Sequence, residues 1–249
     1  MTDELFRVDA TLDTCAAQVQ SAGESGVVLD RTVFYPLGGG QAGDSGWLEL
    51  SDGARLAIAD TRKDKDADGV VTGKIVHVPA PGQQAVLARL HPGDAVIARI
   101  DTARRRRLMR FHTASHVLCH LVGHPVDGCS ITPEHARIDF HMTEPLDKQA
   151  LGADLARVVA AGLPVTVGQV TDAELDAHPE LVKSMSVQPP RGSGTVRTIR
   201  IGEPDGPAID LQPCGGTHVA NTGEIGAVVV TRIEKKSART RRVVLGFAD

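Results

Sequence analysis

Two short motifs, far apart in this chain of 249 residues, carry the side chains best suited to chemistry. His112-Thr-Ala-Ser-His116 and Cys214-Gly-Gly-Thr-His218 each place two metal-binding side chains four residues apart. On a helix this spacing puts both side chains on one face, about one turn apart. Imidazole and thiolate groups together suit zinc, which binds four such ligands in tetrahedral geometry. The two motifs therefore predict one zinc site with four protein ligands.

The number of ligands leaves the purpose of this site open. Four protein ligands are typical of a structural zinc ion, whereas a catalytic ion normally keeps one position open for water. A structural ion would join two distant parts of the chain and stabilise the fold. For the site to be catalytic, water must replace one histidine in the coordination of the zinc ion, or a group of the substrate must bind the ion transiently.

A glycine-rich segment that ends at Gln41 is the second feature that could do chemistry. Consecutive glycines favour tight turns or a close approach of the backbone to another group, and the amide of Gln41 can both donate and accept hydrogen bonds. The segment lacks the Lys-Ser/Thr of a P-loop and does not fit the dinucleotide-binding fingerprint. A plain turn is the alternative, but this segment directly follows a predicted strand, which favours a functional role for it. The structural glycines of this loop are Gly38, Gly39 and Gly40.

Basic side chains follow one another beside the first metal motif and again near the C-terminus, although the net charge of the chain is -4. Arginine suits phosphate because its planar guanidinium bonds two oxygens at once. A local basic surface of this kind predicts a nucleic-acid partner. A solvated helix face and tail is the alternative, since neighbouring arginines point in different directions around a helix. The predicted contacts are Arg104, Arg107, Arg110, Lys235, Lys236, Arg239 and Arg241.

The elements that position these residues fall into two predicted domains. Residues 1–100 contain short β-branched segments between polar turns, which is typical of a small barrel or sandwich, and we predict an antiparallel β-barrel. The charged stretch 62–69 is expected to be a solvated loop. The expected strands are 26–34, a hairpin over 47–58 that turns at Asp52-Gly53, 70–78 and 95–100.

Residues 101–249 are predicted to form an α+β domain of two layers. A helix from about Ala103 to Val122, capped by Asp101 or Thr102, places the two histidines of the first motif beside its apolar stripe. Two further helices are expected, over 147–161 and after Thr171. The expected strands are 136–140, 164–170, 195–201, 209–211, 227–234 and 243–247. Mixed helices and antiparallel strands make the whole chain α+β.

The composition limits the cellular setting. The four cysteines are few and irregularly spaced, so free thiols in a reduced compartment are expected. No stretch reaches the roughly 20 apolar residues that a membrane span needs, and the first residues do not form a signal peptide. We expect a cytoplasmic protein with no membrane association.

Four segments occur in the order found in the editing domains of alanyl-tRNA synthetases. The chain resembles the freestanding alanyl-tRNA editing proteins of the AlaX family, of the medium-length type, from about Phe34 to Phe247. The CGGTH motif with its trailing TGEIG sequence is highly specific, whereas HxxxH alone is not. The four segments are Gly38–Gln41, Arg110–His120, Ala136–Phe140 and Leu211–Gly226.

The resemblance implies a zinc-containing hydrolase that removes serine, with glycine as a second candidate, from mischarged tRNA(Ala) in trans. It implies Zn²⁺ at His112, His116, Cys214 and His218, with the aminoacyl ester beside them. It also implies that Gln41 approaches the same pocket. The zinc ion is expected either to activate the attacking water or to orient the substrate, and no obligate protein partner is expected.

An alanine-activating site distinguishes serine or glycine from alanine by only about 1–3 kcal/mol, so a second pocket must read the serine hydroxyl. The predicted catalytic residues are Gln41, for the oxyanion or amine, and Thr113 and Ser115, for that hydroxyl. Capping or bonding back to the helix is the alternative for both hydroxyls. Ser115 stands where the family usually has threonine and Leu37 where an acidic residue is frequent, which bears on amino-acid discrimination.

Three other functions are also compatible with these residues. A threonyl-type editing domain would deacylate seryl-tRNA(Thr). A zinc hydrolase of small molecules would need no basic surface and would not depend on tRNA. A non-enzymatic, zinc-stabilised RNA-binding module would bind tRNA and leave its ester intact.

Overall fold

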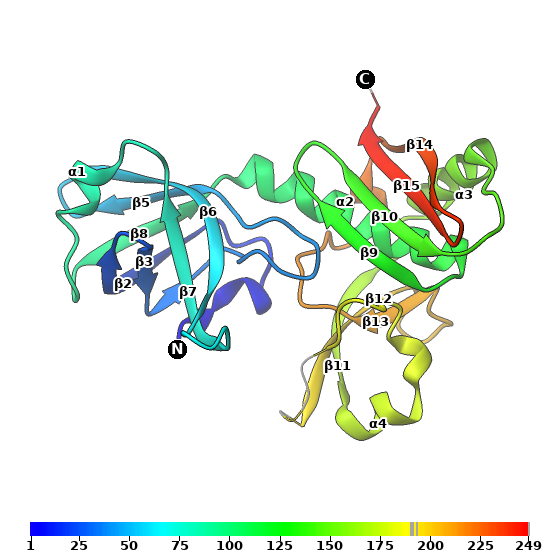
Figure 1. Ribbon diagram of the computed structural model, residues 1–249, viewed down its shortest axis with the longest axis horizontal. Helices are drawn as coiled ribbons and strands as arrows, with labels where there is room; N and C mark the ends of the chain where they lie inside the picture. Colours follow the sequence, from blue (N-terminus) through cyan, green and yellow to red (C-terminus); the bar gives the residue numbers. More distant parts are fainter. Residues whose placement is uncertain (190–191, 193, 249) are drawn as a thin grey trace. The chain divides into compact units, whose positions relative to one another are not determined.

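The structure is a computed structural model that describes residues 1–189, 192 and 194–248. The chain divides into two compact units: unit 1 comprises Met1–Gly38 and Ala42–Arg105, and unit 2 comprises Gly39–Gln41 and the chain from Arg106 onward. The chain combines mainly antiparallel sheets with a few helices (Figure 1), so the predicted α+β class is confirmed. The domain ranges 1–100 and 101–249 stay a prediction.

Unit 1 contains a closed antiparallel barrel of six strands in the order β2-β3-β7-β6-β5-β8, which confirms the predicted barrel. Buried apolar side chains alternate with outward ones, as at Val96, Ala98 and Ile100. The barrel strands are β2 (Thr14–Gly23), β3 (Gly26–Leu29), β5 (Gly46–Leu50), β6 (Arg55–Lys65), β7 (Val71–Pro79) and β8 (Ala95–Ile100). The smaller elements are β1 (Asp3–Glu4), η1 (Leu5–Arg7), β4 (Arg31–Thr32) and α1 (Gln84–Leu87).

Two expectations for unit 1 are wrong. The expected strand over 26–34 ends at Leu29, and the buried Phe34 and Tyr35 lie outside any strand. Side chains satisfy their backbone instead, since Tyr35 N donates to Asp44 Oδ2 at 2.7 Å. The expected loop over 62–69 is shorter, because β6 continues to Lys65 and pairs there with β7. The strand β2 was not expected at all.

A buried ion pair lies at the end of the barrel unit. The guanidinium of Arg105 bonds both carboxylate oxygens of Asp44, with Nε at 3.1 Å and 3.0 Å, and both side chains are almost fully buried. The same guanidinium donates to the carbonyls of Ala10 and Val33. Arg105 therefore belongs to the internal structure of unit 1 and is not a surface cation.

Unit 2 is built around the long helix α2 (Thr102–Val122), whose first residues belong to unit 1. Asp101 caps it, because its Oδ1 accepts from Arg104 N at 2.9 Å. A four-stranded sheet in the order β14-β15-β10-β9 and a three-stranded sheet in the order β11-β12-β13 complete the unit. The strands are β9 (Val126–Ile131), β10 (Ala136–His141), β11 (Val165–Thr171), β12 (Thr195–Ile201), β13 (Asp210–Pro213), β14 (Val228–Ser237) and β15 (Thr240–Phe247).

Helices α2 and α3 (Lys148–Ala161) lie against one face of the four-stranded sheet in unit 2 (Figure 1). Phe111 of α2 contacts Phe247 of β15, with ring centroids 4.4 Å apart, and fully buried Leu108 and Leu118 extend this core. Asp147 caps α3, and Gly162 ends it in the left-handed conformation. The short elements are α4 (Asp172–Ala177), η2 (Pro179–Leu181) and η3 (Thr222–Ile225).

In unit 2, the elements with a strong local sequence pattern were predicted correctly. Helices α2 and α3 and the capped helix α4 agree with expectation, as does the strand β12. The strand β9 was missed because Val-Asp-Gly-Cys-Ser-Ile shows no regular alternation. No helix in the described part of the chain is long and apolar enough to cross a bilayer.

Candidate functional site

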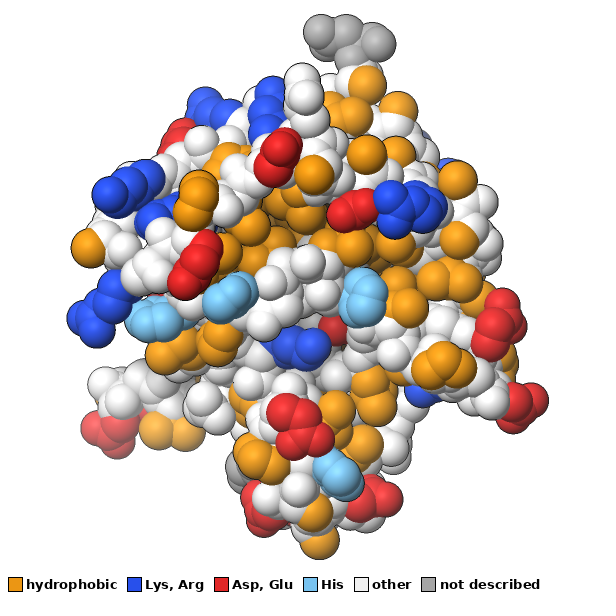
Figure 2. All heavy atoms as spheres, turned by 90° about the vertical axis from the view of Figure 1, so that its right-hand side faces the viewer, with side chains coloured by type: hydrophobic (Ala, Val, Ile, Leu, Met, Phe, Trp, Pro, Cys, Tyr) orange, Lys and Arg blue, Asp and Glu red, His pale blue; other side chains and the backbone are white. Residues whose placement is uncertain are grey.

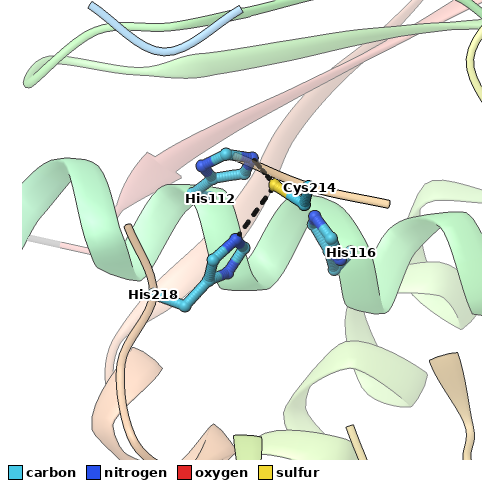
Figure 3. Close-up of side chains that lie close together, drawn as sticks. All are labelled: His112, His116, Cys214 and His218. Carbon is cyan, nitrogen blue, oxygen red and sulfur yellow. Dashed lines mark hydrogen bonds between the residues drawn. The ribbon is translucent and has the colours of Figure 1, made fainter. Parts of the chain in front are cut away.

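Four metal-binding side chains converge inside unit 2. His112 and His116 project from one face of α2, while Cys214 and His218 come from the segment after β13 (Figure 3). The three imidazoles are buried, and Cys214 is partly exposed. Residues on a helix and on a loop about one hundred positions later thus form one cluster, which could hold a metal ion.

The distances within this cluster suit a small metal ion. Cys214 Sγ lies 3.5 Å from His112 Nε2 and 3.4 Å from His218 Nε2. All four ligand atoms lie within 4.8 Å of one another. Bonds of zinc length in tetrahedral geometry place ligand atoms roughly 3.3–3.8 Å apart. Small movements of side chains would therefore close the cluster around one ion.

Each histidine of the cluster has a buried partner at Nδ1. His112 Nδ1 donates to Gln41 Oε1 at 2.8 Å and His116 Nδ1 to Asp210 Oδ2 at 2.9 Å. His218 Nδ1 lies 3.1 Å from the hydroxyl oxygen of Thr113. Because Nδ1 is engaged, Nε2 is the nitrogen left for a metal, and such partners fix the tautomer and the ring orientation.

The thiol of Cys214 lies in surroundings that favour the thiolate. Burial would raise its pKa, but the nearby imidazoles of His112 and His218 outweigh that effect and hold the pKa well below its usual range. Gly216 N also donates to the sulfur at 3.3 Å. The thiolate is the form that binds metals, so the local electrostatics fit the predicted role.

The imidazoles respond to burial and to their partners. Burial would lower the pKa of His116, yet the hydrogen bond to Asp210, together with Cys214, raises it to about 10. Burial and the neighbouring His112 hold the pKa of His218 well below its usual range, which favours the neutral ring. A neutral imidazole can bind a metal through Nε2.

The glycine loop reaches the cluster through Gln41, which clusters with unit 2. Gly40 has φ +84°, and a Cβ there would lie 2.9 Å from the carbonyl oxygen of Cys129. The Gly40 carbonyl accepts from Ile131 N at 2.7 Å, and Gln41 forms a parallel bridge with Ile131 at the edge strand β9. Only glycine allows this approach. The loop therefore places Gln41 and is more than a plain turn.

Gln41 is fully buried, and its amide bonds on both sides. Its Oε1 accepts from His112 Nδ1 and from Thr217 N at 3.1 Å, and its Nε2 donates to Thr217 Oγ1 at 2.9 Å. This pattern identifies which end of the amide is oxygen. The amide is used inside the protein, which favours a role in positioning His112.

Gly216 of the second motif passes directly beside the first. A Cβ at this position would lie 2.1 Å from His112 Cε1 and 3.0 Å from Gln41 Oε1. The first distance is far too short for real atoms, so a larger residue would push the two motifs apart. The glycine in the CGGTH motif is thus required by packing against His112.

Comparisons with known proteins show which family the chain resembles. Residues 196–244 match the threonyl and alanyl tRNA synthetase second additional domain, and residues 7–104 match the family of class II (A) tRNA synthetases. The chain is 31% identical to the alanyl-tRNA editing protein AlaX-M of Saccharolobus solfataricus, over 98% of both chains. It is 33% identical to AlaX-M of Methanosarcina barkeri over the full length of both.

This chain belongs to the AlaX-M family of alanyl-tRNA editing proteins. An alanine–tRNA ligase of Metallosphaera sedula is 36% identical over 84% of this chain, which corresponds to 22% of the ligase. The predicted family is therefore confirmed.

Two hydroxyls predicted to read the substrate in this AlaX-M chain are engaged within the protein. Ser115 Oγ donates to Phe111 O at 2.7 Å, which is the expected alternative of bonding back to the helix. Thr113 Oγ1 accepts from Val219 N at 3.3 Å and contacts His218. Both lie among the metal-site residues, and contact with a serine hydroxyl stays a prediction for each.

The basic residues fall into two groups. Lys235, Lys236 and Arg239 are exposed at the β14–β15 hairpin, where Lys236 also pairs with Asp139 at 2.6 Å. Figure 2 shows Lys and Arg side chains gathered along the upper part of the face that it presents. These three residues remain predicted contacts for tRNA.

The predicted basic residues of α2 are partly used inside the protein. The guanidinium groups of Arg107 and Arg110 each lie 4.3 Å from the centre of the Phe247 ring, and each donates to a backbone carbonyl. Arg107 is nevertheless exposed and stays a predicted contact, as does the half-buried Arg110. Arg104, in unit 1, is half-buried and donates to Gly43 O at 3.2 Å.

We withdraw Arg241 from the predicted tRNA contacts. It is buried, and its guanidinium donates to the backbone carbonyls of Thr143, Ser237 and Thr240. A guanidinium held by three carbonyls stabilises the hairpin and is not presented to phosphate.

Sequence reasoning missed Asp210, the partner of His116. One feature of the sequence could have indicated this role. Asp210 is an acidic residue between two apolar ones in a predicted strand, four positions before Cys214. A carboxylate in such an apolar setting is a candidate partner for a metal-binding histidine.

Proposed function

We propose that this chain is a trans-editing hydrolase that removes an incorrect amino acid from tRNA(Ala) by cleaving its ester bond. The buried His-His-Cys-His cluster, in a chain that matches alanyl-tRNA editing proteins from end to end, carries the proposal. The relatives that the chain matches are named alanyl-tRNA editing proteins, which supports action on an already charged tRNA.

Zinc is the metal that the donor set favours. One thiolate and three imidazoles suit its borderline-soft character, and their spacing suits its tetrahedral bond lengths. A zinc ion bound there would supply positive charge next to the ester and its developing oxyanion.

The protein residues would hold and expose this centre. His112, His116 and His218 bind from the buried side, each fixed at Nδ1. Cys214 and the following Gly215 form the exposed end of the cluster. The aminoacyl ester would therefore approach from the side of these two residues, where a water can also reach its carbonyl carbon.

Gln41 and Thr113 act on the reaction through the histidines that they hold. Their polar atoms bond His112 and His218 and leave the imidazoles with Nε2 directed toward the cluster. Orientation of this kind reduces the reorganisation needed when the substrate binds. We assign both residues a role in positioning these histidines.

The substrate proposed is tRNA(Ala) that carries serine, with glycine as a second noncognate amino acid. Alanine must be spared, so the pocket has to distinguish a hydroxyl or a missing methyl group. Thr113 and Ser115, which lie between the two histidines of α2, remain candidates for contact with the serine hydroxyl.

The decisive assay compares purified protein with seryl-, glycyl- and alanyl-tRNA(Ala) in parallel, with seryl-tRNA(Thr) as the rival substrate. Rapid loss of serine from tRNA(Ala), with alanine spared, supports the proposal. Preference for seryl-tRNA(Thr) would assign threonyl-type editing. No loss of any ester by the metal-loaded protein would leave an RNA-binding module as the function.

Removal of the thiolate tests the metal. Cys214→Ala leaves three imidazoles, so we expect zinc content and deacylation to fall together, measured by metal analysis and by release of serine. Cys15→Ala, which changes a cysteine of unit 1 far along the chain, is the control. Full activity of a Cys214→Ala protein that contains no zinc would contradict a role for the metal.

A further inference from the structure

Asp210 is a buried carboxylate at the start of β13, beside the candidate metal centre. Its side chain is 0% exposed. Oδ2 accepts from His116 Nδ1 at 2.9 Å and from Gln212 Nε2 at 2.9 Å. A buried carboxylate is costly unless it is paired with positive charge or several donors.

Two side chains near Asp210 remain to be considered, one lysine and the imidazole of His116. Lys183 Nζ lies 3.7 Å from Oδ1, and its side chain is about one-third exposed. Oδ1 itself accepts no hydrogen bond among the described residues. The backbone of Lys183 is held in place, because its carbonyl accepts from Val126 N at 2.8 Å. Burial of the carboxylate is thus compensated mainly through His116.

The three histidines of the cluster differ in the charge of their partners. His112 is held by a neutral amide and His218 by a neutral hydroxyl, whereas His116 is held by an ion. A carboxylate at Nδ1 makes the opposite nitrogen a stronger electron donor toward a metal. His116 should consequently be the most strongly donating imidazole of the set.

We propose that Asp210 is a positioning residue that fixes His116 as the Nδ1–H tautomer and thereby sets the affinity of the site for its metal. Gln212 and Lys183 orient the carboxylate for this purpose. The proposal rests on the metal site of the proposed function, and it names a residue that acts through His116 and does not touch the ester.

The first test needs no variant. Long-range ¹H–¹⁵N spectra of the zinc-loaded wild-type protein report which nitrogen of each imidazole carries the proton. We expect His116 to carry its proton on Nδ1, in a strong hydrogen bond to the carboxylate. A proton on Nε2 of His116 would overturn the proposal.

The second test measures zinc affinity by competition with a chelator. Asp210→Ala removes the acceptor and is expected to weaken zinc binding about 10- to 100-fold. Asp210→Asn keeps an acceptor without the charge, so its affinity should lie between those of the alanine variant and the wild type. Affinities equal to that of the wild type in both variants would overturn the proposal.

A matched control distinguishes the weaker zinc binding of the Asp210 variants from the loss of any Asp–His pair. Asp127 Oδ1 accepts from His141 Nδ1 at 3.0 Å, in a pair that is partly exposed and outside the cluster. Asp127→Asn should leave zinc affinity unchanged. An equal loss of affinity in this control would contradict a specific role for Asp210.

Deacylation by the wild-type protein is measured in the same series. Weaker zinc binding by the Asp210 variants supports the inference even where the wild-type protein cleaves no aminoacyl-tRNA, in which case the proposed function alone fails. Active wild-type protein with unchanged zinc affinity in the variants means that the inference alone fails.

Discussion

At the scale of single residues, the candidate site depends on atoms that hold the metal-binding side chains. His112 has its Nδ1 engaged by Gln41, and Gly216 leaves just enough space for the imidazole to lie beside the CGGTH motif. Neither residue is a metal ligand. Both determine where the Nε2 atom of His112 lies, and changes at these positions should therefore weaken metal binding.

We expect Gln41→Ala to lower zinc affinity about 10- to 100-fold and to slow deacylation, because His112 loses the acceptor at Nδ1. Chelator competition and release of serine from seryl-tRNA(Ala) measure the two effects. Thermal unfolding of the metal-free protein should change little. Gln18→Ala, at an exposed position of β2, is the control. An unchanged rate of deacylation would show that the glycine loop has only a structural role.

Gly216→Ala should be far more damaging than its size suggests. The added Cβ would overlap His112 Cε1, so the CGGTH segment must move away, at a cost of roughly 3 kcal/mol and with loss of the cluster. Gly152→Ala on helix α3, where a Cβ meets nothing within 4 Å, is the matched control and should stabilise the protein by up to about 1 kcal/mol. Chemical denaturation and zinc content distinguish the two variants, and wild-type values for Gly216→Ala would refute the packing argument.

At the scale of elements, the barrel of unit 1 contains a polar pair within its apolar interior. His77 of β7 donates from Nδ1 to Val27 O at 2.9 Å, and its Nε2 accepts from the hydroxyl of Thr32 at 2.8 Å. Both side chains are fully buried. The neutral imidazole is satisfied by these two bonds, and burial disfavours the charged imidazolium.

This pair predicts a pH-dependent stability of the barrel. Burial lowers the pKa of His77 from 6.5 to about 4. The unfolded chain binds this proton below pH 6.5 and the folded chain does not, so stability is complete above pH 6.5 and falls as the pH drops from 6.5 to 4, by about 3 kcal/mol. Urea unfolding at a series of pH values measures the effect.

His77→Gln, which cannot take up a proton, should remove this part of the pH dependence. His91→Gln, at an exposed position before β8, should retain it. Identical pH profiles for the wild type and His77→Gln would show that His77 is not the titrating group.

At the scale of the whole molecule, an acidic protein is proposed to bind a polyanion. The net charge of -4 opposes general attraction to tRNA, so contact must depend on local basic residues. Lys235 and Arg239 at the β14–β15 hairpin are exposed and form no ion pair among the residues that the structure describes. They are therefore the residues best suited to reach phosphates.

We expect Lys235→Ala and Arg239→Ala to weaken tRNA binding equally for serine- and alanine-charged tRNA. Each lost phosphate contact should reduce the slope of log affinity against log salt concentration by about 1. Arg157→Ala on α3, whose guanidinium pairs with Asp154, is the control. Binding that is indifferent to salt would argue against a basic tRNA surface.

Sequence alone determined the features that depend on neighbouring residues. The apolar stripe, the cap at Asp101 and the spacing of His112 and His116 predicted α2 and the face that carries both histidines. The CGGTH motif identified the family. Such features are local, because hydrogen bonds within a helix and caps involve residues no more than four positions apart.

Tertiary structure alone decided how the site is held. Gln41 and Asp210 bond histidines that lie 71 and 94 positions away, and no local pattern reports such distances. Their roles depend on the edge of β9 and on β13, whose packing brings these side chains to α2. The ligands could be predicted because their spacing is local. The residues that orient these ligands could not be predicted, because the hydrogen-bond partner of a buried polar group depends on which residues the fold brings next to it.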